Sequence, residues 1–297
     1  ATAATTITAS PAPTITTSGT QTIVLEATSG ATTKYDTVKF FVAGPVTISP
    51  LPAGIREGLN YDSNDSTAVT FALYAPGKSR VSIIGDLPGS NWTEVGTYQM
   101  KKTPDGNYWW LKVTGLAPRT EYSFQYLVNG NLPVADPYVE KIQDPWNDQY
   151  IEAATYPNLK PYPTGMTVNV VGTFQIKKDE YTWTTTNYVR PDKKKIVIYE
   201  LLLRDFVAKH DWKTLIDTIS YLSNLGVNAI QLMPVNEFEG NNSWGYNPDF
   251  YFAVDKYYGP ANDYKKFIDV CHSKGIAVIM DIALNHSFGL SPQVQLY

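Results

Sequence analysis

A carboxylate, an amide and an imidazole lie close together near the end of this 297-residue chain. Asp281, Asn285 and His286 lie at the C-terminal end of an otherwise apolar stretch, Ile276–Leu284. Polar groups cost free energy when buried without a partner, so the set predicts either a strand end with satisfied polar groups or a site for a polar ligand or metal. Ser287 follows directly, but no nucleophile-elbow glycine pattern surrounds it, which disfavours a serine hydrolase.

Two aromatic side chains come from a separate segment. Trp244 and Tyr246 lie in the long loop Glu237–Pro248, which follows the apolar stretch Val227–Met233. The active face of parallel α/β units lies at the C-terminal ends of the strands, so we expect both aromatics on the same rim as the polar set. An aromatic face suits the apolar C–H face of a sugar. The chain's 21 Tyr, 11 Phe and 7 Trp, however, fit a β-sandwich core equally well, and composition alone favours that interpretation.

The elements that must position these residues alternate between apolar strands and amphipathic helices. Ile196–Tyr199 predicts a first strand, and a helix follows with Asp211 as its N-cap and Gly226 at its end. A second helix ends at Gly275. Apolar residues recur at steps of three and four on each helix: Trp212, Leu215, Ile216, Ile219, Leu222 and Leu225 on the first, and Tyr264, Phe267, Ile268 and Cys271 on the second.

This order of elements predicts a parallel sheet. A doubly wound sheet and a (β/α)8 barrel both begin in this way, and periodicity does not separate them. No glycine-rich phosphate loop follows any of the strands, which disfavours a nucleotide-binding sheet and with it an α/β oxidoreductase.

Short strands and turns dominate the chain before residue 195. Residues 60–150 predict one antiparallel β-sandwich, in which Trp109 and Trp110 face opposite ways. The outward ring is free either to bind a sugar or to pack on the parallel-sheet segment, and we expect packing. Residues 1–45 predict a small or incomplete β-domain, 46–59 a linker, and 151–194 a second linker. The expected sandwich strands are Ala68–Tyr74, Arg80–Ile84, Tyr108–Val113 and Glu121–Val128.

Charge and composition narrow the classes of partner. The formal net charge of −4 argues against nucleic acid, because phosphate binding needs a basic face. Cys271 is the only cysteine, so no intrachain disulfide forms. No apolar stretch approaches the ~18 residues of a membrane span, and no signal peptide is evident. The Thr/Ala/Pro-rich opening resembles exported linkers, so we expect a periplasmic, cell-surface or secreted protein.

Three segments together resemble the α-amylase superfamily, glycoside hydrolase family thirteen. Asp281–His286 (DIALNH) resembles the motif at the end of the family's third barrel strand, and Gly226–Pro234 (GVNAIQLMP) the motif around the second. Ser243–Gly259 is similar to the intervening loop of pullulanase-, isoamylase- and branching-enzyme-like members. Val81–Trp92 and Ala135–Tyr138 resemble the immunoglobulin-like starch-module-type domain that precedes such barrels. The resemblance implies β-sandwich domains followed by the first three βα units of a (β/α)8 TIM barrel, residues 195–297.

The resemblance also implies roles for the rim residues. Tyr246 would stack on the sugar in subsite −1, His286 would bind its 6-hydroxyl, and Asp281 would orient an arginine. Asn285 matches a residue that ligates calcium in many members, so calcium is a possible ion, although no cofactor is required. Trp244 lies beside Tyr246 and is a further candidate for substrate binding.

The family's catalytic carboxylates follow its fourth, fifth and seventh strands, and no segment here matches them. A (β/α)8 barrel takes about 250 residues, so the nucleophile and acid/base are expected beyond Tyr297 and this chain alone is expected to be inactive. We expect the parent to be a retaining α-glucan hydrolase of α-amylase, pullulanase or neopullulanase type. The alternative is a non-catalytic glucan-binding fragment. The rest of the barrel, as a second polypeptide, or another copy of the chain would then cover the open sheet.

Overall fold

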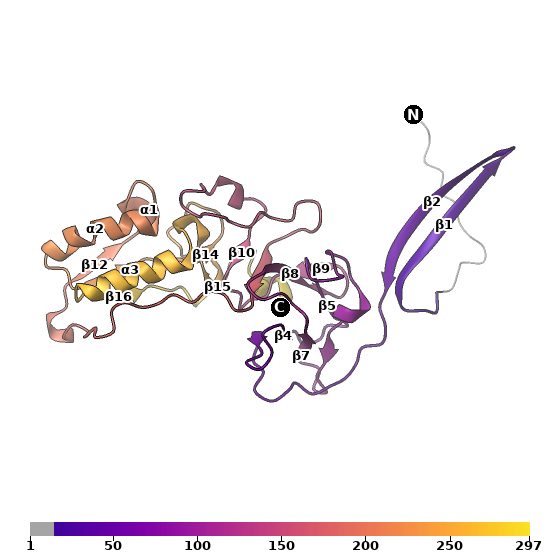
Figure 1. Cartoon of the computed structure of the whole chain (residues 1–297), viewed down its shortest axis with the longest axis horizontal. Coiled ribbons are helices and arrows are strands. Elements are labelled where there is room, and N and C mark those ends of the chain that lie inside the picture. Colours follow the sequence, from indigo (N-terminus) through magenta and orange to yellow (C-terminus); the bar gives the residue numbers. More distant parts are fainter. Residues whose placement is uncertain (1–14) are drawn as a thin grey trace.

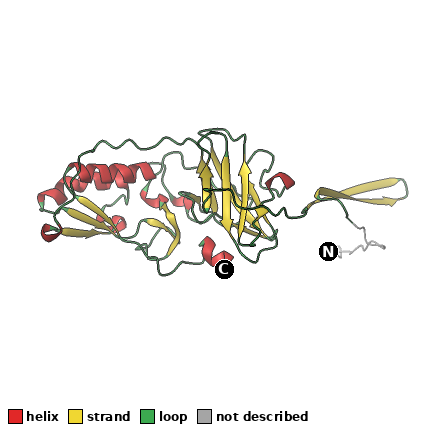
Figure 2. Cartoon of the chain, turned by 90° about the horizontal axis from the view of Figure 1, so that it is seen from below, coloured by secondary structure: helices red, strands yellow, loops and turns green. Residues whose placement is uncertain are grey.

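The computed structural model describes residues 15–297, so the first 14 residues of the β-domain predicted at 1–45 lie outside that range. The molecule is elongated (Figures 1 and 2). A β-hairpin projects from one end, a β-sandwich occupies the middle, and a parallel sheet with two long helices forms the other end.

The hairpin consists of β1 (Gly19–Ser29) and β2 (Thr32–Val42), which pair along their whole length. Both strands lie within residues 1–45, for which the sequence predicts a small or incomplete β-domain. Most of its side chains are exposed, Val24 and Tyr35 among them at 56% and 66%. The hairpin therefore has no hydrophobic core of its own among the described residues.

Two antiparallel sheets face each other in the sandwich. All four expected strands are present, shifted by no more than one residue at an end, but the sequence did not reveal the short ones. One sheet has the order β3 (Gly58–Tyr61), β4 (Val69–Tyr74), β7 (Tyr108–Val113), β6 (Lys101–Lys102). The other has the order β10 (Ile142–Gln143), β11 (Val171–Gln175), β8 (Glu121–Val128), β5 (Val81–Gly85), with β9 (Leu132–Val134) on β8.

Strand β11 lies in the stretch that we expected to be a linker, residues 151–194. It pairs with β8 and β10, and Phe174 on it packs edge-on against Phe71 at 5.4 Å. The strand has only five residues and carries a glycine at its second position, Gly172, which weakens the strand signal. The sandwich is consequently longer than the 60–150 that the sequence indicated.

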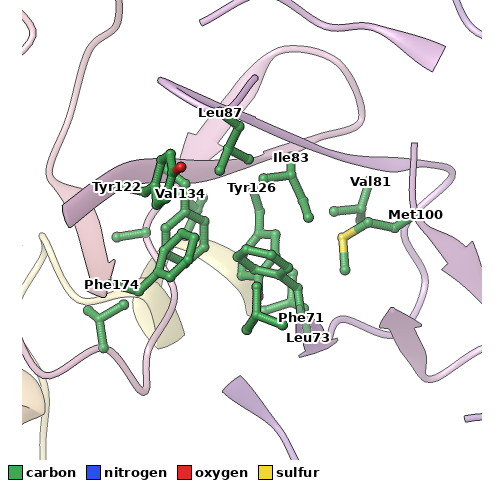
Figure 3. Packing of buried hydrophobic residues seen from close by; sticks show 14 of the residues in the cluster. Phe71, Leu73, Val81, Ile83, Leu87, Met100, Tyr122, Tyr126, Val134 and Phe174 are labelled. Carbon is green, nitrogen blue, oxygen red and sulfur yellow. The ribbon is translucent and has the colours of Figure 1, made fainter. Parts of the chain in front are cut away.

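Aromatic side chains fill the sandwich core (Figure 3). Phe71 packs edge-on against Phe124 at 5.0 Å, and Trp109 is fully buried beside them in the same cluster. Trp110 lies outside this cluster, as strand alternation predicts. The expectation that its ring packs on the parallel-sheet segment is wrong, because Trp110 Nε1 donates to the Ser49 carbonyl and the Lys101 ammonium lies 4.5 Å from the ring centre.

The C-terminal sheet is parallel, with the order β12 (Ile198–Leu201), β13 (Ala229–Leu232), β16 (Ala277–Met280). Helices α2 (Trp212–Asn224) and α3 (Ala261–Ser273) connect successive strands, as expected for a barrel segment. The Asp211 side chain caps α2 by accepting from Thr214 N, and Gly226 has φ +81°. Trp212 stacks on Tyr264 at 4.4 Å, which joins the two helices.

Shorter elements surround this sheet. They are α1 (Leu203–Phe206), β14 (Asn236–Phe238), β15 (Pro248–Val254), α4 (Pro292–Leu296) and the 3-10 turns η1 (Gly96–Tyr98), η2 (Asp148–Tyr150), η3 (Lys193–Lys195) and η4 (Lys256–Tyr258). Within residues 15–297, every helix is too short or too polar to cross a lipid bilayer.

The third βα unit differs from the expectation. No described helix that follows β16 packs on the parallel sheet, because α4 lies against the sandwich instead. Its Leu296 belongs to the sandwich core cluster, and the Leu296 carbonyl accepts from Lys78 Nζ at 2.6 Å. Figure 1 accordingly places the C-terminal end beside β8 and β9. The segment thus contains three parallel strands but only two helices that cover them.

Candidate functional site

The rim of the parallel sheet brings Tyr246, Asp281 and His286 together. The Tyr246 hydroxyl donates to Asp281 Oδ2 at 2.6 Å, and His286 Nε2 lies 2.6 Å from the Tyr246 carbonyl oxygen. A carbonyl only accepts, so Nε2 carries a proton and Nδ1 is left as an acceptor in the neutral ring. The tyrosine ring remains 38% exposed and can meet a ligand.

The loop between β14 and β15 holds Tyr246 by its backbone. Gly245 has φ +87°, and a Cβ there would lie 2.2 Å from the Pro234 carbonyl oxygen. Gly245 N donates to Ser243 Oγ at 2.9 Å, and Asn247 Nδ2 donates to the Glu239 carbonyl at 3.0 Å. Only glycine fits this close approach, so the loop presents Tyr246 in one fixed conformation.

A second tyrosine, which the sequence did not single out, supports the other side of the cluster. Tyr251 on β15 places its hydroxyl 2.7 Å from the His286 carbonyl and 2.5 Å from Ser287 Oγ. Ser287 therefore bonds to a tyrosine hydroxyl, and it makes no hydrogen bond to an imidazole nitrogen of the described residues. This arrangement fits a supporting role for Ser287.

Hydrogen bonding to Asp281, together with burial and the charge of Asp281, raises the pKa of Tyr246 to about 12. The phenol consequently stays protonated at neutral pH and keeps donating to the carboxylate. This contact holds the carboxylate at the strand end and fixes the ring edge, so the free ring face is pre-positioned.

Trp244 and Asn285, the other two candidates, are exposed, Trp244 at 60%. Neither side chain has a hydrogen-bond partner among the described residues. Within residues 15–297, no group of three or more His, Cys, Asp or Glu side chains could hold a metal ion. Calcium prefers six to eight oxygen ligands, which include amide and backbone carbonyl oxygens, and calcium at Asn285 stays a prediction.

A buried ion cluster lies beneath the same loop. Lys256 Nζ contacts Glu237 Oε1 at 2.6 Å and Asp148 Oδ1 at 3.2 Å, and the side chains of all three are less than a tenth exposed. Burial alone would lower the pKa of Lys256, but the surrounding carboxylates, with Asp255 included, raise it instead. Burial raises the pKa of Asp255 to about 7 and that of Glu237 well above its usual value. The cluster joins the segment after β10 to β14.

Asp249 is a second buried acid next to the loop. It is 3% exposed, and its Oδ1 has no hydrogen-bond partner among the described residues. Burial, followed by the charge of Glu239, raises its pKa from 3.8 to about 7. Between about pH 4 and pH 7 the Asp249 carboxyl is therefore protonated in the folded state and ionised in the unfolded state. The contribution of Asp249 to stability therefore falls as pH rises from about 4 to about 7 and is constant above that.

Asp249→Asn should remove this part of the pH dependence. The free energy of unfolding of Asp249→Asn minus that of wild type should rise by on the order of 1–3 kcal/mol from pH 4 to pH 8. Urea unfolding at several pH values measures it, with exposed Asp217→Asn as control. Parallel pH profiles for wild type and Asp249→Asn would show that the carboxyl is not perturbed by folding.

Comparison with known proteins now identifies the two parts of the chain. Residues 177–291 match the family described as "Alpha amylase, catalytic domain". Residues 57–146 match "Carbohydrate-binding module 48 (Isoamylase N-terminal domain)". An α-amylase catalytic-domain segment is thus present at residues 177–291. The chain carries a carbohydrate-binding-module-48 β-sandwich followed by this segment.

Individual relatives agree with these two matches. It is 28% identical over 222 residues to a malto-oligosyltrehalose trehalohydrolase of Saccharolobus solfataricus, covering 75% of the chain and 34% of the relative. It is 28% identical over 237 residues to a 1,4-alpha-glucan branching enzyme of Bacillus cytotoxicus, and this match covers 75% of the chain and 33% of the relative. A pullulanase from Bacillus acidopullulyticus has the same fold, with a TM-score of 0.60 and 24% identity. The match covers 82% of this chain and 32% of the pullulanase. The chain spans about a third of the length of these relatives.

Proposed function

We propose that the protein acts on α-glucans by a retaining mechanism, with Tyr246, Asp281 and His286 forming one wall of the site for the reacting sugar. The observation that carries the proposal is the half-exposed Tyr246 ring, which Asp281 and His286 fix at the C-terminal ends of the strands. The names of the relatives, a trehalohydrolase and a branching enzyme, support α-glucan as the substrate class.

In this proposal the Tyr246 face stacks on the sugar, and His286 Nδ1 accepts a hydrogen bond from one of its hydroxyls. Trp244 offers a second exposed ring in the same loop, and Asn285 an amide at the rim. Asp281 acts by positioning Tyr246. Retaining enzymes place two carboxyl groups about 5–5.5 Å apart, one as nucleophile and one as acid/base.

We infer that neither of these two groups is among the carboxylates of this rim. Asp205 is paired with Arg204, Glu237 with Lys256, and Asp281 with the Tyr246 hydroxyl. An acid that is already engaged in this way is poorly placed to attack a sugar or to protonate a leaving group. The nucleophile and acid/base are expected from further strands of the barrel.

Exposed apolar residues on the two outer strands of the parallel sheet support the same proposal. Ile198 on β12 and Met280 on β16 are each 48% exposed. Apolar strand faces are usually covered, so we propose that further barrel strands pack there, from the same polypeptide, a second one or another copy. Calcium at Asn285 and export of the protein remain predictions.

Tyr246→Ala tests the function in a protein that includes the whole barrel. We expect kcat/KM for maltooligosaccharides to fall at least about tenfold, or about 1.4 kcal/mol of transition-state stabilisation. Tyr221→Ala, an exposed tyrosine on α2, is the control. An unchanged kcat/KM for Tyr246→Ala would remove Tyr246 from the site.

Purified residues 1–297 should not hydrolyse starch, pullulan or maltotriose. Turnover near the rate of the longer protein would contradict the inference about the carboxylates. Glucan binding without turnover by the longer protein would instead favour the alternative, a non-catalytic binding module.

A further inference from the structure

A hollow lies where the segment between β10 and β11 meets the parallel-sheet unit. Its volume is about 680 Å³, within the usual 300–1,000 Å³ of small-molecule sites. Asn147 and Tyr150 line it from the sandwich side, and Asn241 and Asn242 from the loop that carries Tyr246. The first residues of that loop therefore face this hollow, while its later residues form the Tyr246 cluster.

The charges that line the hollow cancel within it. Arg204 forms two hydrogen bonds to the carboxylate of Asp205, at 2.7 Å and 3.0 Å, and its third nitrogen donates to Asn242 Oδ1 at 2.8 Å. A guanidinium that is engaged in this way offers little net attraction to an anion. The hollow consequently favours a neutral ligand.

Aromatic rings and free amide atoms complete the lining. Tyr150 is 69% exposed, and the Tyr257 ring is stacked against His210 with 5.6 Å between ring centres and 17° between planes. Asn241 Nδ2 bonds to the Asn147 carbonyl, and Asn242 Oδ1 to Arg204. Asn241 Oδ1 and Asn242 Nδ2 have no partner within the part of the chain that the structure describes. They offer one acceptor and one donor to a ligand.

We propose that this hollow binds glucose units of an α-glucan chain away from the sugar that contacts Tyr246. The lining combines ring faces with planar amide groups and no net charge, which suits a neutral polyhydroxylated ligand. The inference rests on the proposed function for the substrate class, but it adds a separate site to which the sandwich side contributes. Because the loop carries residues of both sites, one chain bound in the hollow could reach the rim.

Maltoheptaose titrated into residues 1–297 by calorimetry tests the proposal. We expect Tyr150→Ala and Asn242→Ala each to raise Kd about fivefold or more, which corresponds to about 1 kcal/mol. The matched controls are Tyr221→Ala and Asn262→Ala, which replace exposed residues on α2 and α3 and should bind as wild type. Thermal unfolding of each variant checks that it is folded. In wild type, bound maltoheptaose should also slow amide hydrogen exchange in residues 147–150 and 241–242.

The outcomes separate this site from the Tyr246 site. Weaker binding by Tyr150→Ala and Asn242→Ala but not by Tyr246→Ala would support the hollow and contradict the proposed rim site. Weaker binding by Tyr246→Ala alone, with no protection of 147–150, would overturn the hollow and leave the proposed function intact. No binding of maltoheptaose by wild type would contradict both.

Discussion

Lys256→Met is expected to lower the free energy of unfolding by about 3–5 kcal/mol, because it leaves buried carboxylates without their cation. Glu237 and Asp148 both contact the ammonium, and Asp255 lies beside it with a pKa raised to about 7. Methionine matches the length of the lysine stem, so the loss should come from the charge and its hydrogen bonds and only slightly from packing.

Urea unfolding at pH 8 measures the effect, since the carboxylates are most ionised there. Lys266→Met on the exposed side of α3 is the matched control and should change stability by less than about 0.5 kcal/mol. The double variant Lys256→Met/Glu237→Gln should recover part of the loss, because one buried charge is removed with its partner. A loss no larger than that of the control would mean that water reaches the cluster and solvates it.

Gly245→Ala should displace the loop that holds Tyr246. The added Cβ would lie 2.2 Å from the Pro234 backbone oxygen and would also occupy a backbone conformation, φ +87°, that disfavours side chains. We expect a loss of stability of at least about 3 kcal/mol, with strain of about 1–2 kcal/mol and the remainder from the clash. Maltoheptaose binding at the rim should weaken by at least about tenfold, because the ring loses its fixed position.

Gly240→Ala provides the comparison within the same loop. Gly240 has φ +81°, but a Cβ there would meet nothing within 4 Å. It should therefore cost only the backbone strain of about 1–2 kcal/mol. Equal losses of stability for the two variants would show that the contact with Pro234 relaxes without cost.

The sequence was sufficient for the elements whose signal is local. The helix face from Trp212 to Leu222, the Asp211 cap and the glycine at 226 all follow from spacing and backbone preference, and the structure contains each of them. The placement of Tyr246 beside Asp281 and His286 followed from a general property of parallel sheets together with the family resemblance. Their role in binding sugar stays a prediction.

Contacts between distant segments were not predictable in the same way. Nothing local in the sequence shows that folding buries Lys256, Glu237 and Asp148 together. Trp110 was expected on the parallel-sheet unit, yet the segment at Ser49 covers it. In each case the missing information was which remote part of the chain supplies the partner, and periodicity carries no such information.

The sandwich core has a consequence for synthesis of the protein. Its cluster includes Phe250, Ala253 and Leu296, which come long after the last strand of the sandwich, β11. A chain emerging from the ribosome at about 5–20 residues per second therefore exposes part of this core until those residues arrive. The sandwich and the first part of the barrel thus complete a common core, and the N-terminal module cannot reach its final packing before its neighbour is made.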